Sequence, residues 1–330
     1  MTNMKLKAGT PEEVGMSAQR VRHVVDLAED WVAQGIHPGL VLLAARRGQI
    51  VLHEAFGRLT PDEDSRPLEL NALFPLTSLT KSITATVAMI LVEEGRLGPN
   101  RPVAEYIPEF TGEGKDKVMV HHLLTHTSGL TSEDVEAHKQ QKMGTVEIPP
   151  PDGTQDPAIH EYLFLGYDTP LTIPPGTEQR YCDYGFEIVG EIVRRVSGQS
   201  LTDFARERLF EPLGMKDTTY IVPESESHRV VKRPADGPLA FLNSREWEQT
   251  PWAAPGAYST AMDMAVFGQM FLNRGIYGDT RILSPVTVAE MTRNQIPGIS
   301  SHFADEYFPE AGAFTVEIEQ FPLIHRGLQR

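Results

Sequence analysis

The sequence predicts an α+β fold in which an antiparallel sheet is flanked by helices and accompanied by a mostly helical region. The start of the chain supports the sheet, because an amphipathic helix after Ser17 is followed by two apolar stretches that meet at a tight turn, Arg47-Gly48. The rest supports the helical region, because apolar residues recur at helical spacing in several segments between about residues 60 and 290. A helix followed by a hairpin is a common start for a layer in which helices cover a sheet.

Three segments follow from this pattern. Residues 1–60 are expected to hold the N-terminal helix and the first strands, which occupy residues 39–57 on either side of Gly48. Residues 61–290 are expected to form the mostly helical region, and residues 291–330 to return toward the sheet. The chain is long enough for a large core and a second lobe.

Buried helices are predicted where apolar residues follow the helical period most closely and a glycine or polar turn ends the run. These segments are residues 83–95, 186–198, 200–210 and 263–272. Two stretches show little periodicity and several prolines and acidic residues, 131–172 and 222–250. Both are expected to be irregular, and the first is interpreted as a long loop that borders a pocket.

The composition is that of an ordinary globular protein, with 40% apolar and 23% charged residues. Thirty basic residues against 45 acidic ones give a formal net charge of -15, which disfavours nucleic acid and anionic membranes as partners. Cys182 is the only cysteine, so an internal disulfide is excluded. Because the sequence shows neither an export signal nor an apolar stretch that approaches a membrane span, we expect a cytoplasmic protein.

A Ser-x-x-Lys pattern, Ser78-Leu-Thr-Lys81, opens the helix predicted up to Gly95. Side chains three residues apart in a helical turn share a face, so the hydroxyl and the amine are close enough to interact. A serine becomes a good nucleophile only when a neighbouring group takes its proton. Lys81 can do this if burial and the helix dipole keep it neutral for part of the time. The pattern alone is more often a helix-start serine beside a surface lysine.

The order of the motifs resembles the serine β-lactamase-like hydrolases, in particular the branch of class C β-lactamases and family VIII carboxylesterases. The matching pieces occur in family order between about residues 11 and 295. They are Ser78-Leu-Thr-Lys81, Leu123-Leu-Thr-His-Thr-Ser-Gly-Leu130, Pro175-Gly-Thr followed by Tyr181-Cys-Asp183, Gly185-Phe-Glu-Ile-Val-Gly190, and Ser259-Thr-Ala-Met-Asp263. The resemblance implies a β-lactamase/transpeptidase-like fold, with the serine in a cleft between the sheet and the helical region.

The resemblance also implies roles for three residues. Ser78 would be the acylated nucleophile, Lys81 its proton acceptor, and Tyr181 the group that passes protons to the leaving group and to water. The ammonium of Lys81 is expected to stabilise the Tyr181 phenolate, so that the two share one proton and either may act as the base. His126 lies in a segment that is structural in the family, and we interpret it as a core histidine with satisfied hydrogen bonds.

Two features depart from the family pattern. The family usually has Tyr-x-Asn, whereas Asp183 occupies the third position here and cannot donate to a substrate carbonyl. Asp183 would either pair with Lys81 and make it a poorer base, or cap the following helix. The third family motif is matched only by His325 and Gly327, close to the end of this sequence. Either His325 belongs to the motif and the strands that follow it are missing, or the motif itself lies outside this sequence; we favour the second, and in both cases we expect an incomplete sheet.

The first functional hypothesis is an esterase that acts on small or short-chain esters through an acyl-Ser78 intermediate. The missing amide at position 183 favours esters over lactams, and aromatic residues that could line an acyl pocket are present, namely Trp247, Trp252 and Tyr258. The alternatives are a β-lactamase or D-amino-acid amidase or peptidase of the same fold, and a catalytically impaired homologue that binds an acyl ligand or a protein.

No cofactor is implied by these motifs. His121, His122 and His126 lack an acidic partner at metal-ligand spacing, so a zinc site is not predicted. The expected partner is a small-molecule ester, with neither nucleic acid nor membrane, and the oligomeric state is left open. A conventional α/β-hydrolase is disfavoured, because the chain lacks a Gly-x-Ser-x-Gly elbow.

Overall fold

The computed structural model describes residues 4–301, and these form two compact units. The first unit comprises residues 4–77, 206–250 and 256–282. The second comprises residues 78–205, 251–255 and 283–301. The segment boundaries that the sequence suggests at residues 60 and 290 stay a prediction.

A three-stranded sheet forms the base of the first unit, with the strand order β1-β3-β2. β2 (Gly39–Arg46) and β3 (Gln49–Gly57) are antiparallel, and β1 (Lys7–Ala8) runs parallel to β3. The predicted turn between β2 and β3 is confirmed. Arg47 and Gly48 have φ angles of 53° and 76°, and two consecutive positive φ values are what a two-residue type I′ hairpin turn requires.

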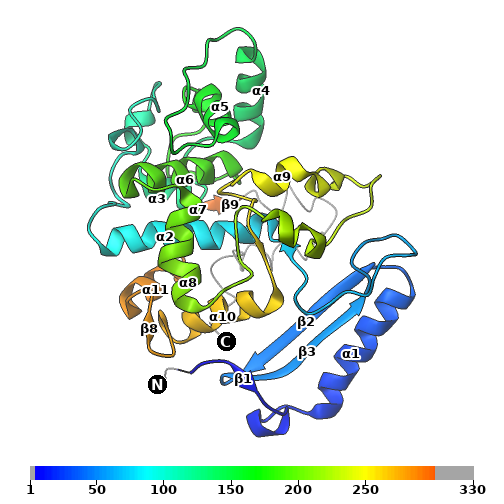
Figure 1. The fold of residues 1–330 in the computed structure, drawn as a ribbon. Helices are drawn as coiled ribbons and strands as arrows, with labels where there is room; N and C mark the ends of the chain where they lie inside the picture. Colours follow the sequence, from blue (N-terminus) through cyan, green and yellow to red (C-terminus); the bar gives the residue numbers. More distant parts are fainter. Residues whose placement is uncertain (1–3, 302–330) are drawn as a thin grey trace. The chain divides into compact units, whose positions relative to one another are not determined.

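α1 (Ala18–Ala33) lies along one face of this sheet (Figure 1). Ser17 caps it as predicted, because the serine side chain accepts a hydrogen bond from the backbone N–H of Arg20. The helix buries Val25 and Ala28, and it contacts β3. The helix and hairpin predicted from the start of the chain are therefore confirmed.

The remaining elements of the first unit are short, apart from α10 (Ala261–Leu272), which contacts β2. They are β4 (Phe74–Pro75) paired with β6 (Tyr258–Ser259), β7 (Ile276–Tyr277) paired with β8 (Thr280–Arg281), α8 (Glu211–Leu213) and α9 (Arg245–Gln249). The stretch 222–250 contains α9 and two short 3-10 turns, so it is largely irregular, as predicted.

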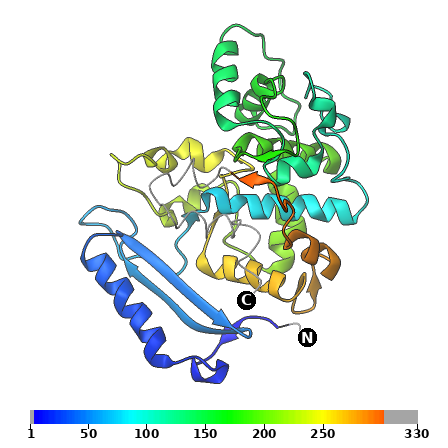
Figure 2. The same ribbon diagram turned by 180° about the vertical axis from the view of Figure 1, so that it is seen from behind.

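α6 (Asp183–Ser197) is the central helix of the second unit and contacts five other helices. These are α2 (Thr80–Glu93), α3 (Val120–Leu124), α4 (Ser132–Lys142), α5 (Pro157–Gly166) and α7 (Leu201–Ala205). The unit also holds α11 (Pro285–Met291), and β5 (Glu178–Gln179) paired in parallel with β9 (Ser300–Ser301). Figure 2 shows these helices from behind.

α2 is buried over most of its length, as its apolar period predicts. Ile83, Val87 and Leu91 are completely buried, and they recur at the spacing of one helix face. The run ends at Gly95, whose φ of 70° is the left-handed conformation that favours glycine after a helix. Within the described residues, no helix combines the length and the apolar character needed to cross a membrane.

The prediction of a long loop over residues 131–172 is wrong, because this stretch contains α4 and α5. α4 has little apolar periodicity, and it is stabilised instead by its ends and by charge pairs. The Thr131 side chain accepts a hydrogen bond from the backbone N–H of Asp134, and Lys139 forms an ion pair with Glu136. α5 is capped by Asp156. Helix caps and charge pairs therefore mark these helices, and a search for apolar periodicity does not detect such features.

Candidate active site

Ser78 lies in a single 3-10 turn, Thr77–Leu79, immediately before α2. The turn leaves Ser78 exposed, whereas Lys81, one turn further along, is only 1% exposed. Thr77 has a φ angle of 47°, which is unusual for a β-branched residue and indicates backbone strain directly before the serine. The local structure thus presents a serine hydroxyl to solvent above a buried lysine.

The structure brings together the three residues that were predicted to act together. The Oγ of Ser78 lies 2.6 Å from the hydroxyl oxygen of Tyr181. The Nζ of Lys81 donates a hydrogen bond to the same Oγ at 3.1 Å, and it lies 4.8 Å from the centroid of the Tyr181 ring. The serine oxygen is therefore within proton-transfer distance of both candidate bases.

Asp183 is the first residue of α6, and its carboxylate forms an ion pair with Lys81. The distance from Nζ to Oδ1 is 2.6 Å. The helix cap is Cys182, which makes no side-chain capping bond. Of the two interpretations left open by the sequence, pairing with Lys81 is therefore the one that the structure supports. The pair places a negative charge directly beside the buried lysine.

The electrostatics of Tyr181 differ from the expectation. Burial raises the pKa of Tyr181 above its ordinary value, and the negative charge of Asp183 adds to this effect. The positive charge of Lys81 and the hydrogen bonds to Lys81 and Ser78 oppose it, but they do not outweigh it. The ammonium of Lys81 thus stabilises the phenolate as expected, but loss of hydration at this half-buried position exceeds that attraction, and the net pKa of Tyr181 is raised.

His126 is buried, but it is not the satisfied core histidine that the sequence suggested. Its Nδ1 accepts a hydrogen bond from the backbone N–H of Cys182 at 3.2 Å. Its Nε2 is buried and has no hydrogen-bond partner within residues 4–301. Burial and the nearby Lys81 charge lower the pKa of His126 to about 3, so the imidazole is neutral at ordinary pH. His126 therefore lies near Tyr181 and Cys182, although the sequence suggested only a structural role for it.

Three more residues were predicted to bind the substrate or support the site: Tyr258, His325 and Gly327. Tyr258 belongs to the first unit, where it is completely buried in a cluster with Leu73, Val222 and Val230. His325 and Gly327 lie outside the described residues. Of the aromatic residues considered for an acyl pocket, Trp252 packs edge-on against Tyr162 at a ring distance of 5.2 Å. The substrate-binding role of these residues stays a prediction.

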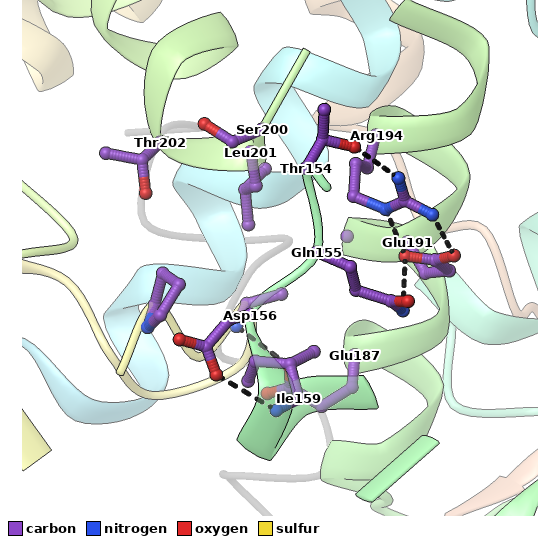
Figure 3. Close-up of a pocket in the computed structure, with 13 residues that line it drawn as sticks. Thr154, Gln155, Asp156, Ile159, Glu187, Glu191, Arg194, Ser200, Leu201 and Thr202 are labelled. Carbon is purple, nitrogen blue, oxygen red and sulfur yellow. Dashed lines mark hydrogen bonds and ion pairs between the residues drawn. The ribbon is translucent and has the colours of Figure 1, made fainter. Parts of the chain in front are cut away.

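Two cavities in the second unit differ in what they could hold. The smaller has a volume of about 50 Å³ and lies beside α6, where Arg194 is hydrogen-bonded to Thr154 and to Glu191 (Figure 3). That volume suits a few water molecules rather than a substrate. The larger, about 380 Å³, is lined by residues of α2, α3 and α11 and by Phe186. Phe186 also lies 5.9 Å, by its ring centroid, from the Nζ of Lys81.

The family model described as Beta-lactamase matches residues 24–304 of the chain. Among curated proteins, the chain is 27% identical to the "Putative D-alanyl-D-alanine carboxypeptidase" of Salmonella schwarzengrund (strain CVM19633) over 330 aligned positions. That alignment covers 87% of this chain and 72% of the Salmonella protein.

Solved structures give the same fold. A family VIII carboxylesterase is 28% identical, with a TM-score of 0.67 over 84% of this chain and 76% of that chain. A penicillin-binding protein homologue from Caulobacter crescentus is 24% identical, with a TM-score of 0.69 over 85% of this chain and 77% of that chain. The second likeness supports the fold alone. The predicted β-lactamase/transpeptidase-like α+β fold is confirmed.

Proposed function

We propose, from the premise that this chain belongs to the β-lactamase family of serine hydrolases, that it hydrolyses small or short-chain carboxylic esters through an acyl-Ser78 intermediate. The observation that carries the proposal is the position of the Ser78 Oγ, 2.6 Å from the Tyr181 hydroxyl and 3.1 Å from the Lys81 Nζ. A nucleophile, a base and a proton relay are thus within hydrogen-bond reach of one another.

Acylation would begin when Lys81 is in its neutral form. The Ser78 proton passes to the Lys81–Tyr181 pair while the Oγ bonds to the ester carbonyl carbon. Because its raised pKa keeps Tyr181 protonated at neutral pH, we assign the accepting role to the lysine amine and the relay role to the tyrosine hydroxyl. The bond to the alcohol oxygen then breaks, and the alcohol leaves with a proton from the pair.

Deacylation would repeat these steps with water in place of the serine. Water loses a proton to the same pair as its oxygen bonds to the acyl carbon, and the bond to the Ser78 Oγ then breaks. Ser78 recovers a proton from the pair, and the carboxylic acid is released. One water molecule is consumed for each ester cleaved, and Ser78, Lys81 and Tyr181 return to their starting states.

Asp183 favours esters over lactams and peptides. An asparagine side chain can donate a hydrogen bond to an amide carbonyl of the substrate, whereas the Asp183 carboxylate can only accept. The carboxylate also cancels the Lys81 charge at 2.6 Å. Both effects weaken the binding of the amide and carboxylate groups that β-lactams and cell-wall peptides carry. Neutral esters depend on neither interaction.

The direct test is release of p-nitrophenol from a short-chain p-nitrophenyl ester by purified protein, with Ser78→Ala as the matched variant. We expect a burst followed by turnover in the wild type, and loss of both in Ser78→Ala with an unchanged circular dichroism spectrum. Turnover that persists in Ser78→Ala would contradict the acyl-Ser78 intermediate. A folded wild type that releases no p-nitrophenol would contradict the esterase proposal.

A β-lactamase or D-amino-acid amidase or peptidase is the second candidate, and the curated relative from Salmonella favours it through its description as a carboxypeptidase. Parallel assays with a chromogenic cephalosporin and a peptide ending in D-alanine separate the candidates. The ester should have the highest kcat/KM. A higher value for the cephalosporin or the peptide would replace the esterase assignment.

A catalytically impaired binding homologue is the third possibility, and covalent labelling distinguishes it from an enzyme. A fluorophosphonate reacts with an activated serine, so the wild type should be labelled at Ser78 and Lys81→Met should not. A wild-type protein that resists labelling while it still binds a carboxylic acid would support the binding role.

A further inference from the structure

We propose that His126 is a positioning residue for Tyr181. It accepts hydrogen bonds from the backbone on either side of the tyrosine, and its ring packs against the tyrosine ring. The inference rests on the proposed function, because its consequence is that the Tyr181 hydroxyl is fixed at hydrogen-bond distance from Ser78. It goes beyond that function by assigning a role to a histidine that touches neither the serine nor the lysine by a hydrogen bond in the described structure.

The backbone contacts come from two different atoms of one residue. The carbonyl oxygen of His126 accepts a hydrogen bond from the backbone N–H of Arg180 at 2.8 Å. The Nδ1 of its side chain accepts one from the backbone N–H of Cys182 at 3.2 Å. Arg180 and Cys182 are the neighbours of Tyr181 in the sequence. His126 therefore fixes the chain immediately before and immediately after the tyrosine.

The third contact is with the tyrosine ring itself. The ring centroids of His126 and Tyr181 are 4.5 Å apart, with an angle of 33° between their planes. The Nζ of Lys81 lies 4.8 Å from the centroid of the same Tyr181 ring. Aromatic rings at this spacing attract each other and resist rotation. The phenol is thus close to both an imidazole and an ammonium, which limits the positions open to its hydroxyl.

The backbone conformation of His126 makes the double contact possible. Its φ angle is 57°, in the left-handed region that most residues avoid and that histidine, asparagine and aspartate tolerate better. Strain of this kind persists only where the surrounding structure imposes it, and it is common near functional sites. The next residue, Thr127, also binds the segment that leads to Tyr181, because its carbonyl accepts a hydrogen bond from the backbone N–H of Gly176 at 2.8 Å.

The protonation of His126 argues against a packing role alone. Because Nδ1 accepts a hydrogen bond, the single proton of the neutral ring is on Nε2, which is buried without a partner among the residues that the structure describes. A buried donor without an acceptor is unfavourable, and a phenylalanine would fill the space without that cost. The charged groups that face the ring are Lys81 and Asp183, and burial keeps the imidazole neutral beside them. The hydrogen bond accepted at Nδ1 is the contact that a phenylalanine would lack.

The test compares three variants in the p-nitrophenyl ester assay. His126→Phe keeps a ring but removes the acceptor, and we expect kcat to fall about 10- to 100-fold while KM changes less than about threefold. His126→Asn keeps a side-chain acceptor and tolerates the backbone conformation, so it should recover most of kcat. His122→Phe is the control, because the Nδ1 of His122 likewise accepts a backbone N–H, from Met119, and no contact with Tyr181 is seen.

A double-variant cycle separates positioning of Tyr181 from a general loss of structure. If His126 acts through Tyr181, then His126→Phe should lower kcat/KM no further, within about twofold, once Tyr181→Phe is present. If the double variant loses kcat/KM by the product of the two single losses, the proposal is overturned, while the esterase assignment still stands. Wild-type kcat in His126→Phe would overturn it as well.

A measurement without substrate keeps the proposal falsifiable if the esterase assignment fails. Fluorotyrosine is incorporated, and the Tyr181 signal in the fluorine NMR spectrum is assigned by its loss in Tyr181→Phe. That signal should broaden or shift in His126→Phe and stay unchanged in His122→Phe. An unchanged Tyr181 signal in His126→Phe would show that His126 does not hold the ring.

Discussion

Lys81 and Asp183 form an ion pair whose two members differ sharply in exposure. Their charged atoms are 2.6 Å apart, yet the Lys81 side chain is 1% exposed and the Asp183 side chain is 46% exposed. If the lysine is removed, Asp183 Oδ1 stays buried, but the exposed part of the side chain keeps its contact with water. If the carboxylate is removed, a buried ammonium loses its counter-charge, and such a loss is strongly unfavourable.

This asymmetry predicts unequal effects on stability. Asp183→Ala should lower the free energy of unfolding by about 3 kcal/mol, whereas Lys81→Met, which replaces the ammonium by an apolar chain of similar length, should change it by less than about 1 kcal/mol. Urea unfolding at pH 7, followed by circular dichroism, measures both. If Lys81→Met lowered the free energy of unfolding more than Asp183→Ala does, the ion pair itself would stabilise the protein, and the burial of the lysine would not explain the difference.

Asp183 also predicts a shift in substrate preference. Its carboxylate can only accept hydrogen bonds, whereas an asparagine can donate one to an amide carbonyl of the substrate. In Asp183→Asn, the kcat/KM for a chromogenic cephalosporin relative to that for the ester should rise about tenfold. Asp168→Asn is the matched control, because Asp168 pairs with Lys142 in the same unit. An unchanged ratio in Asp183→Asn would contradict a role of Asp183 in substrate choice.

The sequence predicted that Ser78, Lys81 and Tyr181 lie together, but it did not predict α4 and α5. Ser78 and Lys81 are three residues apart in one chain segment, so local spacing alone places them on one face. Tyr181 is 103 residues from Ser78, and its position came only from the resemblance to a family. Sequence could not decide whether Asp183 caps α6 or pairs with Lys81, because that choice depends on how α2 and α6 pack.

Two kinds of feature were missed, for different physical reasons. α4 and α5 were missed because the search used apolar periodicity, although Thr131 and the pair Asp156-Pro157 are recognisable helix starts. The role of His126 could not have been found in this way. It depends on a positive φ angle and on contacts with residues more than 50 positions away, and neither leaves a local pattern.

Glu187 predicts a pH dependence of stability. Its carboxylate is 3% exposed and accepts hydrogen bonds from the backbone N–H groups of Ala253 and Ala254, both at 2.9 Å. Burial raises its pKa to about 7, so the folded protein holds this proton at pH values where the unfolded chain has released it. Its contribution is therefore complete below the unfolded pKa, near 4.5, and is lost as pH rises to about 7.

The measurement is the difference in unfolding free energy between the wild type and Glu187→Gln across that range. The wild type should lose up to about 3 kcal/mol between pH 4.5 and pH 7 relative to Glu187→Gln, whose side chain does not titrate. Comparison with the variant cancels the contributions of the other carboxylates. Glu133→Gln, an exposed position on α4, should show no such difference. Parallel pH profiles for the wild type and Glu187→Gln would exclude a raised pKa at Glu187.

Thr77 precedes the nucleophile in a strained conformation, and substitutions there should separate stability from activity. At a φ angle of 47° a Cβ atom is unfavourable, so Thr77→Gly should be more stable than Thr77→Ala by about 1 kcal/mol, the reverse of the usual order. Thr77→Gly should nevertheless lower kcat about three- to tenfold, because a freer backbone positions the Ser78 Oγ less well. Thermal unfolding and the ester assay measure the two effects. If Thr77→Ala were the more stable variant, the strain would not exist. If both variants kept wild-type kcat, the strain would have no role in placing the serine.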